Sequence, residues 1–270
     1  MEAGLTEQPG FGSIDWRAPW LEDWRGLAQA CVGTGWREAL NAKAGEFAIV
    51  NARGLPLRFV AQQALPDGMA YEAFIDETGC VPTRANLHDF LNALVWLRYP
   101  AIKRGLNAIQ ARELAEGGVG QTRGRLRDMA TLFDENAALF ACADAALAEA
   151  LRAHEWEALF IGARASFGVH CGAFLFGHAL LEKLTAPFKA ITAHAWVVEV
   201  DAGFFQQSRM EQRGLLDAVV ARQLETALPG SGFTPLPVLG LPGWAAGQDE
   251  AYYRDQNVFR PKRNKTNLEC

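Results

Sequence analysis

The chain has 270 residues, a formal net charge of -5 and a sequence pI of about 5.6, with 50% hydrophobic and 21% charged residues. This composition is that of a folded globular protein and excludes the disordered and fibrous classes. The acidic balance gives no support for a nucleic-acid partner. The longest apolar run, GAFLFGHALL, is interrupted by His178 and has roughly half of the ~20 residues that a membrane span needs, so we expect a soluble protein with no membrane partner.

The first residues, MEAGLTEQPGFGSIDW, are acidic and contain no apolar segment that would act as a secretory signal. The 5 cysteines are widely spaced and odd in number, which favours reduced thiols over a disulfide framework or a structural zinc site. From these features we predict a cytoplasmic protein. Its expected organisation is a loose lead-in at residues 1–13, a single globular domain at 14–262 and a basic tail at 263–270.

Two short amphipathic segments between residues 14 and 42 contain Trp16, Trp20, Trp24 and Trp36. Trp20 and Trp24 lie four residues apart on one helix face, so we interpret the cluster as a packing surface, with a partner-binding surface as the alternative. Short β-rich segments follow at 47–50 and 55–62. Residues 69–79 predict a short helix that ends at a left-handed Gly79.

The segment 78–136 organises the chain, because it predicts two consecutive helices that each carry a polar stripe. The first begins near Ala85, with Asn86 or Thr83 as its cap, and ends at Pro100, which opens the second helix. The short connection makes the helices neighbours, so we expect their polar edges to meet. These edges consist of His88, Asn92 and Tyr99 on the first helix and Lys103, Asn107 and Gln110 on the second. Asp89 and Trp96 are expected further round the first helix, towards solvent or a second partner.

Residues 130–142 predict a β-hairpin with Asp134, Glu135 and Asn136 at its turn, and a continuous helix is the alternative. Asp144 is expected to cap a helix through about His154. A buried helix at 172–184, a strand at 191–200 and an amphipathic helix at 209–227 follow. We therefore predict an α+β fold: a mainly helical single domain with a small antiparallel sheet that includes the hairpin and the 191–200 strand.

Several motifs resemble those of a known family. They are ETGCVPTRANLHDFLNALVWLRYP with K..LN..Q after it, then RLRD..TLFDEN, FGHALLEKL..PFK..TAHA, VLGLPGW and FRPKR. Over roughly residues 45–262 the chain resembles an uncharacterised bacterial domain-of-unknown-function family, family 3025. One departure is Asn136-Ala137, where Asn-Gly would be expected at a tight hairpin turn, since alanine resists a positive φ. The resemblance implies a related fold and a bacterial cytoplasmic protein, and it supplies no reaction.

The adjacent residues His88 and Asp89 resemble the ligand pair of metal-dependent phosphohydrolases. That site also needs an upstream histidine, and no histidine precedes His88 in this chain. Adjacent residues on a helix point about 100° apart, which limits their ability to share one metal ion. We therefore assign no metal ligand, and no sequence motif specifies a cofactor.

The polar stripes predict a groove that holds a small anionic molecule, with His88 as general acid/base and Lys103 as charge clamp. The alternative is a set of buried hydrogen-bonding residues that tie elements together. The expected catalytic residues are His88, Asp89, Lys103, Asp128, Asp134 and Glu135, and the expected substrate-binding residues are Arg84, Asn92, Asn107, Gln110, Arg127 and His178. His178 and Glu182 lie four residues apart, so a carboxylate that orients an imidazole is a further expectation.

Two functions follow as hypotheses. The first is a hydrolase that acts on a phosphorylated or other anionic substrate in a pocket containing His88, Lys103 and Asn107. The second is a non-catalytic binding or scaffold protein that uses its Trp-rich N-terminal surface and an exposed Trp96. The sequence specifies neither the substrate nor an oligomeric state.

Overall fold

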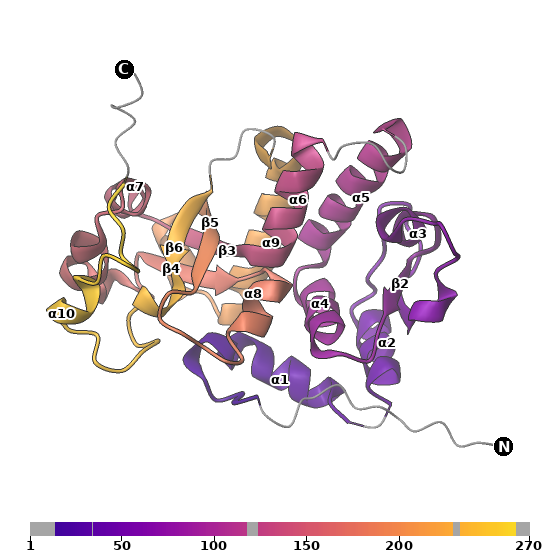
Figure 1. Ribbon diagram of the computed structural model, residues 1–270, viewed down its shortest axis with the longest axis horizontal. Helices are drawn as coiled ribbons and strands as arrows, with labels where there is room; N and C mark the ends of the chain where they lie inside the picture. Colours follow the sequence, from indigo (N-terminus) through magenta and orange to yellow (C-terminus); the bar gives the residue numbers. More distant parts are fainter. Residues whose placement is uncertain (1–13, 34, 118–123, 229–232, 263–270) are drawn as a thin grey trace. The chain divides into compact units, whose positions relative to one another are not determined.

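The computed structural model describes residues 14–33, 35–117, 124–228 and 233–262 (Figure 1). The α+β class is confirmed, with helices in the majority and two small sheets. The expected lead-in at 1–13 and basic tail at 263–270 lie outside the described residues. The chain divides into two compact units, each composed of three chain segments. Residues 1–137, 175–186 and 209–232 form the first unit, and residues 138–174, 187–208 and 233–270 form the second.

The first unit is mainly helical and contains a two-stranded sheet. Its elements in chain order are α1 (Glu22–Cys31), α2 (Trp36–Glu46), β1 (Arg58–Ala61), α3 (Tyr71–Thr78), β2 (Cys80–Thr83), α4 (Leu87–Arg98), α5 (Pro100–Gly117), α6 (Arg125–Asn136), α8 (His178–Lys183) and α9 (Arg209–Ala227). Strands β1 and β2 pair in parallel, so the expectation of purely antiparallel pairing was wrong for this sheet.

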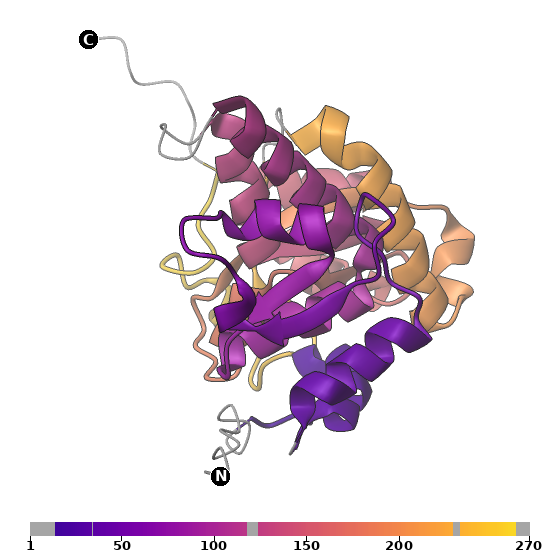
Figure 2. The same ribbon diagram turned by 90° about the vertical axis from the view of Figure 1, so that its right-hand side faces the viewer.

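Side chains from α2 hold the parallel pair in place. Asn41 donates from Nδ2 to the carbonyl oxygen of Phe59 at 2.9 Å and accepts the Phe59 amide at 2.7 Å. Arg37 donates to the carbonyl oxygen of Thr83 at the end of β2. Figure 2 shows the two strands between α3 and the N-terminal helices. Gly79 ends α3 with a φ of 72°, as expected, and turns the chain directly into β2.

The two central helices, α4 and α5, begin and end where the sequence predicts. Asn86 caps α4 by accepting the Asp89 amide, and Pro100 opens α5. The N-terminus of α5 is capped from α9, because the Asp217 carboxylate accepts the amides of Ala101 and Ile102 at 3.0 and 2.8 Å. This arrangement satisfies two of the amides that a helix start leaves unpaired.

Aromatic side chains form a continuous core through the first unit. Trp24 packs on Tyr99, Tyr99 on Phe176 and Phe176 on Phe133, with ring centroids 6.0, 5.5 and 5.1 Å apart. Trp24 and Tyr99 are each 1% exposed, so the interpretation of the N-terminal tryptophans as packing residues fits this helix. Trp96 is also 1% exposed, and the expectation that it faces solvent or a partner was wrong.

The hairpin predicted at 130–142 was wrong, because the chain forms the helix α6 through Asn136 and then the strand β3 (Ala137–Cys142). In the helical conformation Ala130 and Phe133 lie on one face and are fully buried. Asp134, which sequence rules disfavour inside a helix, is stabilised there by an ion pair with Lys103. A partner distant in sequence thus overrides the local preference.

The helix predicted at 172–184 was wrong in its first half. Residues Cys171–Leu175 form the strand β4, and the helix α8 begins only at His178. A short apolar run fits a buried strand as well as a buried helix, so its periodicity does not distinguish them.

The second unit contains a four-stranded sheet with the order β4-β3-β5-β6. Its further elements are α7 (Ala145–Ala153), β5 (Thr192–Glu199), β6 (Thr234–Pro237) and α10 (Glu250–Tyr253). All six residues of β3 are buried, as expected for an inner strand. The predicted 191–200 strand and the helix capped by Asp144 are confirmed, and β6 is a strand that was not predicted.

Candidate functional site

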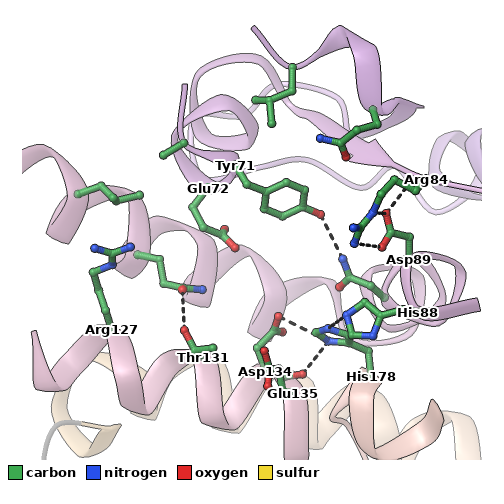
Figure 3. Close-up of a pocket in the computed structure, with 16 residues that line it drawn as sticks. Tyr71, Glu72, Arg84, His88, Asp89, Arg127, Thr131, Asp134, Glu135 and His178 are labelled. Carbon is green, nitrogen blue, oxygen red and sulfur yellow. Dashed lines mark hydrogen bonds and ion pairs between the residues drawn. The ribbon is translucent and has the colours of Figure 1, made fainter. Parts of the chain in front are cut away.

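A pocket of about 460 Å³ in the first unit is lined by residues from α3, α4, α5, α6 and the start of α8 (Figure 3). Most of the predicted site residues line it: Arg84, His88, Asp89, Asn92, Gln110, Arg127, Asp134, Glu135 and His178. The expectation that the polar edges of α4 and α5 meet is correct at one point, where Lys103 Nζ donates to Asn92 Oδ1 at 2.8 Å.

Three predicted site residues do not line this pocket. Lys103 and Asn107 are 5% and 2% exposed and lie around a small enclosed space together with Glu72 and Asp134. Asp128 is exposed on the first turn of α6 and contributes nothing to the pocket wall. The site therefore has an inner layer of buried polar groups behind the residues that a ligand would meet.

Lys103 is the centre of this inner layer. Its ammonium group donates to both carboxylate oxygens of Asp134, at 2.6 and 2.8 Å, and to Asn92. Burial alone would raise the pKa of Asp134, but Lys103 and His178 beside it bring that pKa below its ordinary value. A lysine ammonium has three hydrogens, so these three contacts saturate it, and no donor remains for a bound anion.

A chain of hydrogen bonds runs along the pocket through two histidines. His88 Nδ1 lies 2.7 Å from Glu182 Oε2, and His88 Nε2 lies 3.1 Å from His178 Nε2. His178 Nδ1 lies 2.9 Å from the backbone oxygen of Asp134. The expected pairing of a carboxylate with an imidazole is therefore present, but Glu182 holds His88 rather than its own helix neighbour His178.

These contacts fix the direction of the hydrogen bond between the two rings. Burial lowers the pKa of His178 to about 4, so this ring is neutral at pH 7. Its Nδ1 faces the backbone oxygen of Asp134, so Nδ1 carries the hydrogen and Nε2 keeps a lone pair. His88 Nε2 must then donate to His178 Nε2. His88 Nδ1 lies 2.7 Å from Glu182 Oε2, which holds the ring in this orientation.

His178 reaches Asp134 because of the glycine that precedes it. A Cβ at Gly177 would lie 2.3 Å from the backbone oxygen of Glu135 and 2.5 Å from the Asn136 amide nitrogen. The first turn of α8 therefore packs directly against the last turn of α6, and only glycine permits this approach. Gly177 in the sequence FGH therefore allows His178 to lie at the end of α6.

Asp89 lines the pocket with its carboxylate already paired. Its Oδ2 accepts from the backbone amide and Nε of Arg84, at 2.7 and 3.0 Å, and its Oδ1 accepts from Arg84 Nη2 at 2.8 Å. Asp89 is 8% exposed, so its expected position towards solvent was wrong. These contacts with Arg84 stabilise the start of α4. His88, which precedes Asp89, also lines the pocket.

Seven residues that line the pocket were not among the predicted site residues: the polar Gln62, Tyr71, Glu72 and Thr131 and the apolar Leu65, Ala70 and Leu114. Burial raises the pKa of Tyr71 and of Glu72. Asn107 holds Glu72 by donating to its Oε2 at 2.6 Å and to its backbone oxygen at 2.9 Å. The signal available in the sequence was the position of Thr131 relative to Arg127 and Glu135, since residues four apart share a helix face. The mistaken prediction of a hairpin at 130–142 hid this helical spacing.

Arg127 lies at the opposite end of the pocket from the histidines in Figure 3, and Gln110 lines the same pocket. Arg127 Nε is buried without a hydrogen-bond partner among the described residues. Gln110, which is 8% exposed, accepts a 3.3 Å hydrogen bond from Thr131 Oγ1 through its Oε1. This end of the pocket therefore contains polar groups whose hydrogen-bonding capacity is not used within the described chain.

Within the described ranges, no group of three or more His, Cys, Asp or Glu side chains is arranged as a metal site. Among the helices that the structure describes, none has both the length and the apolar character required to cross a bilayer.

Comparison with protein-family models gives one match, over residues 57–263. The chain belongs to the family described as "Protein of unknown function (DUF3025)". The family resemblance seen in the sequence is thus confirmed, and the match includes every element that lines the pocket. Searches among curated proteins and among solved structures return no match.

Proposed function

We propose that this DUF3025 protein is a hydrolase that acts on a small anionic molecule in the pocket, with the two histidines as its acid–base groups. The observation that carries the proposal is the directed contact from His88 Nε2 to His178 Nε2 on the wall of an open pocket. Acid–base catalysis requires one group that holds a proton and another that accepts one. This pair supplies both at neutral pH.

The proton balance of hydrolysis can be written with these groups alone. The two Nε2 atoms occupy each other in the free pocket, so water and substrate first replace this contact. His178 Nε2 then takes a proton from the attacking water, and His88 Nε2 donates its proton to the oxygen of the leaving group. His178 then holds the extra proton, which its low pKa disfavours, and the proton returns to His88 across the 3.1 Å contact. Glu182 orients the His88 ring through its contact with Nδ1.

The pocket's cationic anchor differs from the one suggested by the sequence. Lys103 has no donor left for a substrate, and Arg84 is occupied by Asp89. We propose that Lys103 and Asn107 position Asp134 and Glu72, and that Arg127 provides the charge that attracts an anion. Arginine suits this role because its planar group matches carboxylate and phosphate oxygens.

The scaffold alternative has weaker support. It required an exposed Trp96 and an accessible tryptophan surface, but Trp96 and Trp24 are 1% exposed and Trp36 is 7% exposed. The proposal retains a bacterial, cytoplasmic protein, which rests on the family resemblance and on the free thiols of Cys31, Cys80, Cys142 and Cys171.

The test is a hydrolysis screen with 4-nitrophenyl phosphate, bis(4-nitrophenyl) phosphate and 4-nitrophenyl acetate. His88→Asn and His178→Asn keep a side-chain amide near the position of Nδ1 and remove Nε2, and each is expected to lower turnover by about 10²- to 10⁴-fold. His170→Asn is the matched control, because His170 is exposed and lies in the second unit. Turnover that persists in both pocket variants, or that falls equally in His170→Asn, would contradict the proposal.

A further inference from the structure

The cationic side chains of the pocket differ in whether a neighbouring carboxylate balances their positive charge. Arg84 pairs with Asp89, and His88 pairs with Glu182. Of the cationic side chains that line the pocket in the described part of the chain, Arg127 has no carboxylate at salt-bridge distance. Because its Nε is buried without a hydrogen-bond partner among the described residues, this asymmetry marks Arg127 as the place where a negative charge from outside the chain would be most favourable.

The neighbours of Arg127 supply further donors. Gln110 is almost fully buried and lines the pocket, and its Oε1 is held by Thr131 Oγ1, which orients its amide nitrogen. Arg127 also lies in the first turn of the twelve-residue helix α6, where the helix dipole favours an anion. Arg127 acts electrostatically on Glu72, whose oxygen Oε2 is engaged by Asn107. Burial raises the pKa of Glu72, against the lowering effect of Lys103, of the Asn107 hydrogen bond and of Arg127.

The distance from this end to the histidines follows from the helix. Arg127, Thr131 and Asp134 lie along one face of α6, and the backbone of Asp134 contacts His178. Seven residues of helix correspond to about 10 Å. A group bound to Arg127 is therefore too far from His88 Nε2 to be the group that reacts there. In Figure 3, Arg127 and the two histidines lie at opposite ends of the residues drawn.

We infer that Arg127 and Gln110 form a subsite for a terminal oxyanion, a carboxylate or phosphate, that serves as a handle about 10 Å from the reacting bond. This inference rests on the proposed function and makes it more specific. The substrate class is an elongated small molecule with an anionic end, and hydrolysis takes place at its other end. A phosphomonoester cleaved at its own handle phosphate does not fit this arrangement.

The experiment measures binding of inorganic phosphate and of acetate, so that it needs no turnover. The full chain is labelled with ¹⁵N, and the side-chain signals of Arg127 Nε, Gln110 Nε2 and the histidine rings are followed during titration with each anion. Arg127→Gln removes the charge from the pocket. Arg125→Gln is the matched control, since Arg125 is exposed in the same turn of α6 and does not line the pocket.

We expect saturable shifts of the Arg127 and Gln110 signals with at least one of the two anions. In Arg127→Gln the dissociation constant should rise at least about tenfold, and in Arg125→Gln it should change less than about twofold. The anion that binds more tightly identifies the handle as phosphate or carboxylate.

Two results would overturn the inference. One is the absence of saturable binding, or binding with the same affinity in Arg127→Gln. The other is binding that shifts the rings of His88 and His178 and is lost in His88→Asn but kept in Arg127→Gln. The second result would place the anion beside the two histidines. It would contradict the oxyanion subsite at Arg127 and Gln110 but not the proposed acid–base role of the histidines. Loss of hydrolysis in the histidine variants is measured separately, and failure there would contradict the proposed function alone.

Discussion

Lys103 and Arg127 are two cationic residues of the same unit with opposite surroundings. Lys103 is 5% exposed, and three oxygen atoms within 2.8 Å occupy its donors. Arg127 lines an open pocket, and its buried Nε has no partner among the described residues. The comparison shows that burial and pairing identify a charge that supports the fold, whereas an unpaired charge at a pocket wall indicates a charge available to a ligand.

Lys103→Met sharpens this comparison with the largest expected effect. The change leaves the Asp134 carboxylate buried without its ion pair, so we expect a loss of about 3–5 kcal/mol in the free energy of unfolding. Urea denaturation at pH 7 measures this loss. The double variant Lys103→Met/Asp134→Asn should lose clearly less than the sum of the single changes, since neither charge remains. A loss below about 1 kcal/mol in Lys103→Met would contradict a structural role.

The low pKa of His178 predicts a pH dependence of stability. As the pH falls through 6.5, the unfolded chain takes up the proton that folded His178 accepts only near pH 4. The difference in pKa therefore has no effect on stability above about pH 6.5, and the free energy of unfolding falls by about 3 kcal/mol in total between about pH 6.5 and pH 4. Denaturation curves at pH 7, 5.5 and 4 measure it. His178→Asn should flatten the slope between these values, and an unchanged slope would contradict the assignment.

Gly177→Ala tests the close approach of α8 to the end of α6, which places His178 at the pocket. The new methyl group would meet the backbone of Glu135 and Asn136, so we expect a loss of about 1–3 kcal/mol. Thermal melting measures the effect. Gly162→Ala is the control, because the nearest atom to a Cβ at Gly162 is the Glu157 backbone oxygen at 3.9 Å. Equal losses of stability in the two variants would show that the close contact of Gly177 with Glu135 and Asn136 has no effect of its own.

Arg127→Gln has the smallest expected effect on stability. Because Arg127 forms no salt bridge among the described residues, we expect a change within about 0.5 kcal/mol or a slight stabilisation. The measurement is the same urea denaturation as for Lys103→Met. A loss as large as that of Lys103→Met would mean that Arg127 supports the fold, and the difference between the two residues would disappear.

Much of the first unit follows from local chemistry in the sequence. Asn86, Pro100 and Gly79 mark helix ends through capping and restricted dihedral angles, and each lies at the predicted boundary. The mistaken hairpin and the mistaken first half of the 172–184 helix had another cause. Both segments are short and apolar, and contacts with distant residues determine whether they become helix or strand.

The candidate site was predicted only in part, because contacts with distant residues also determine which side chains meet there. The stripe on α5 identified polar residues correctly, but a stripe does not specify their partners. Lys103 and Gln110 contact α6 through Asp134 and Thr131, whereas Asn107 contacts α3 through Glu72. The contact between His88 and His178 joins residues far apart in the chain, so sequence spacing contained no signal for it.

The central claim is the proton arrangement of the two histidines, and the most direct test is a long-range ¹H–¹⁵N correlation spectrum of the wild-type imidazoles at pH 7. His88→Asn and His178→Asn assign the signals. The account predicts a neutral His178 with its hydrogen on Nδ1, and a hydrogen on Nε2 of His88. A charged His178, or a neutral His178 with its hydrogen on Nε2, would reverse the direction of the contact and contradict the mechanism.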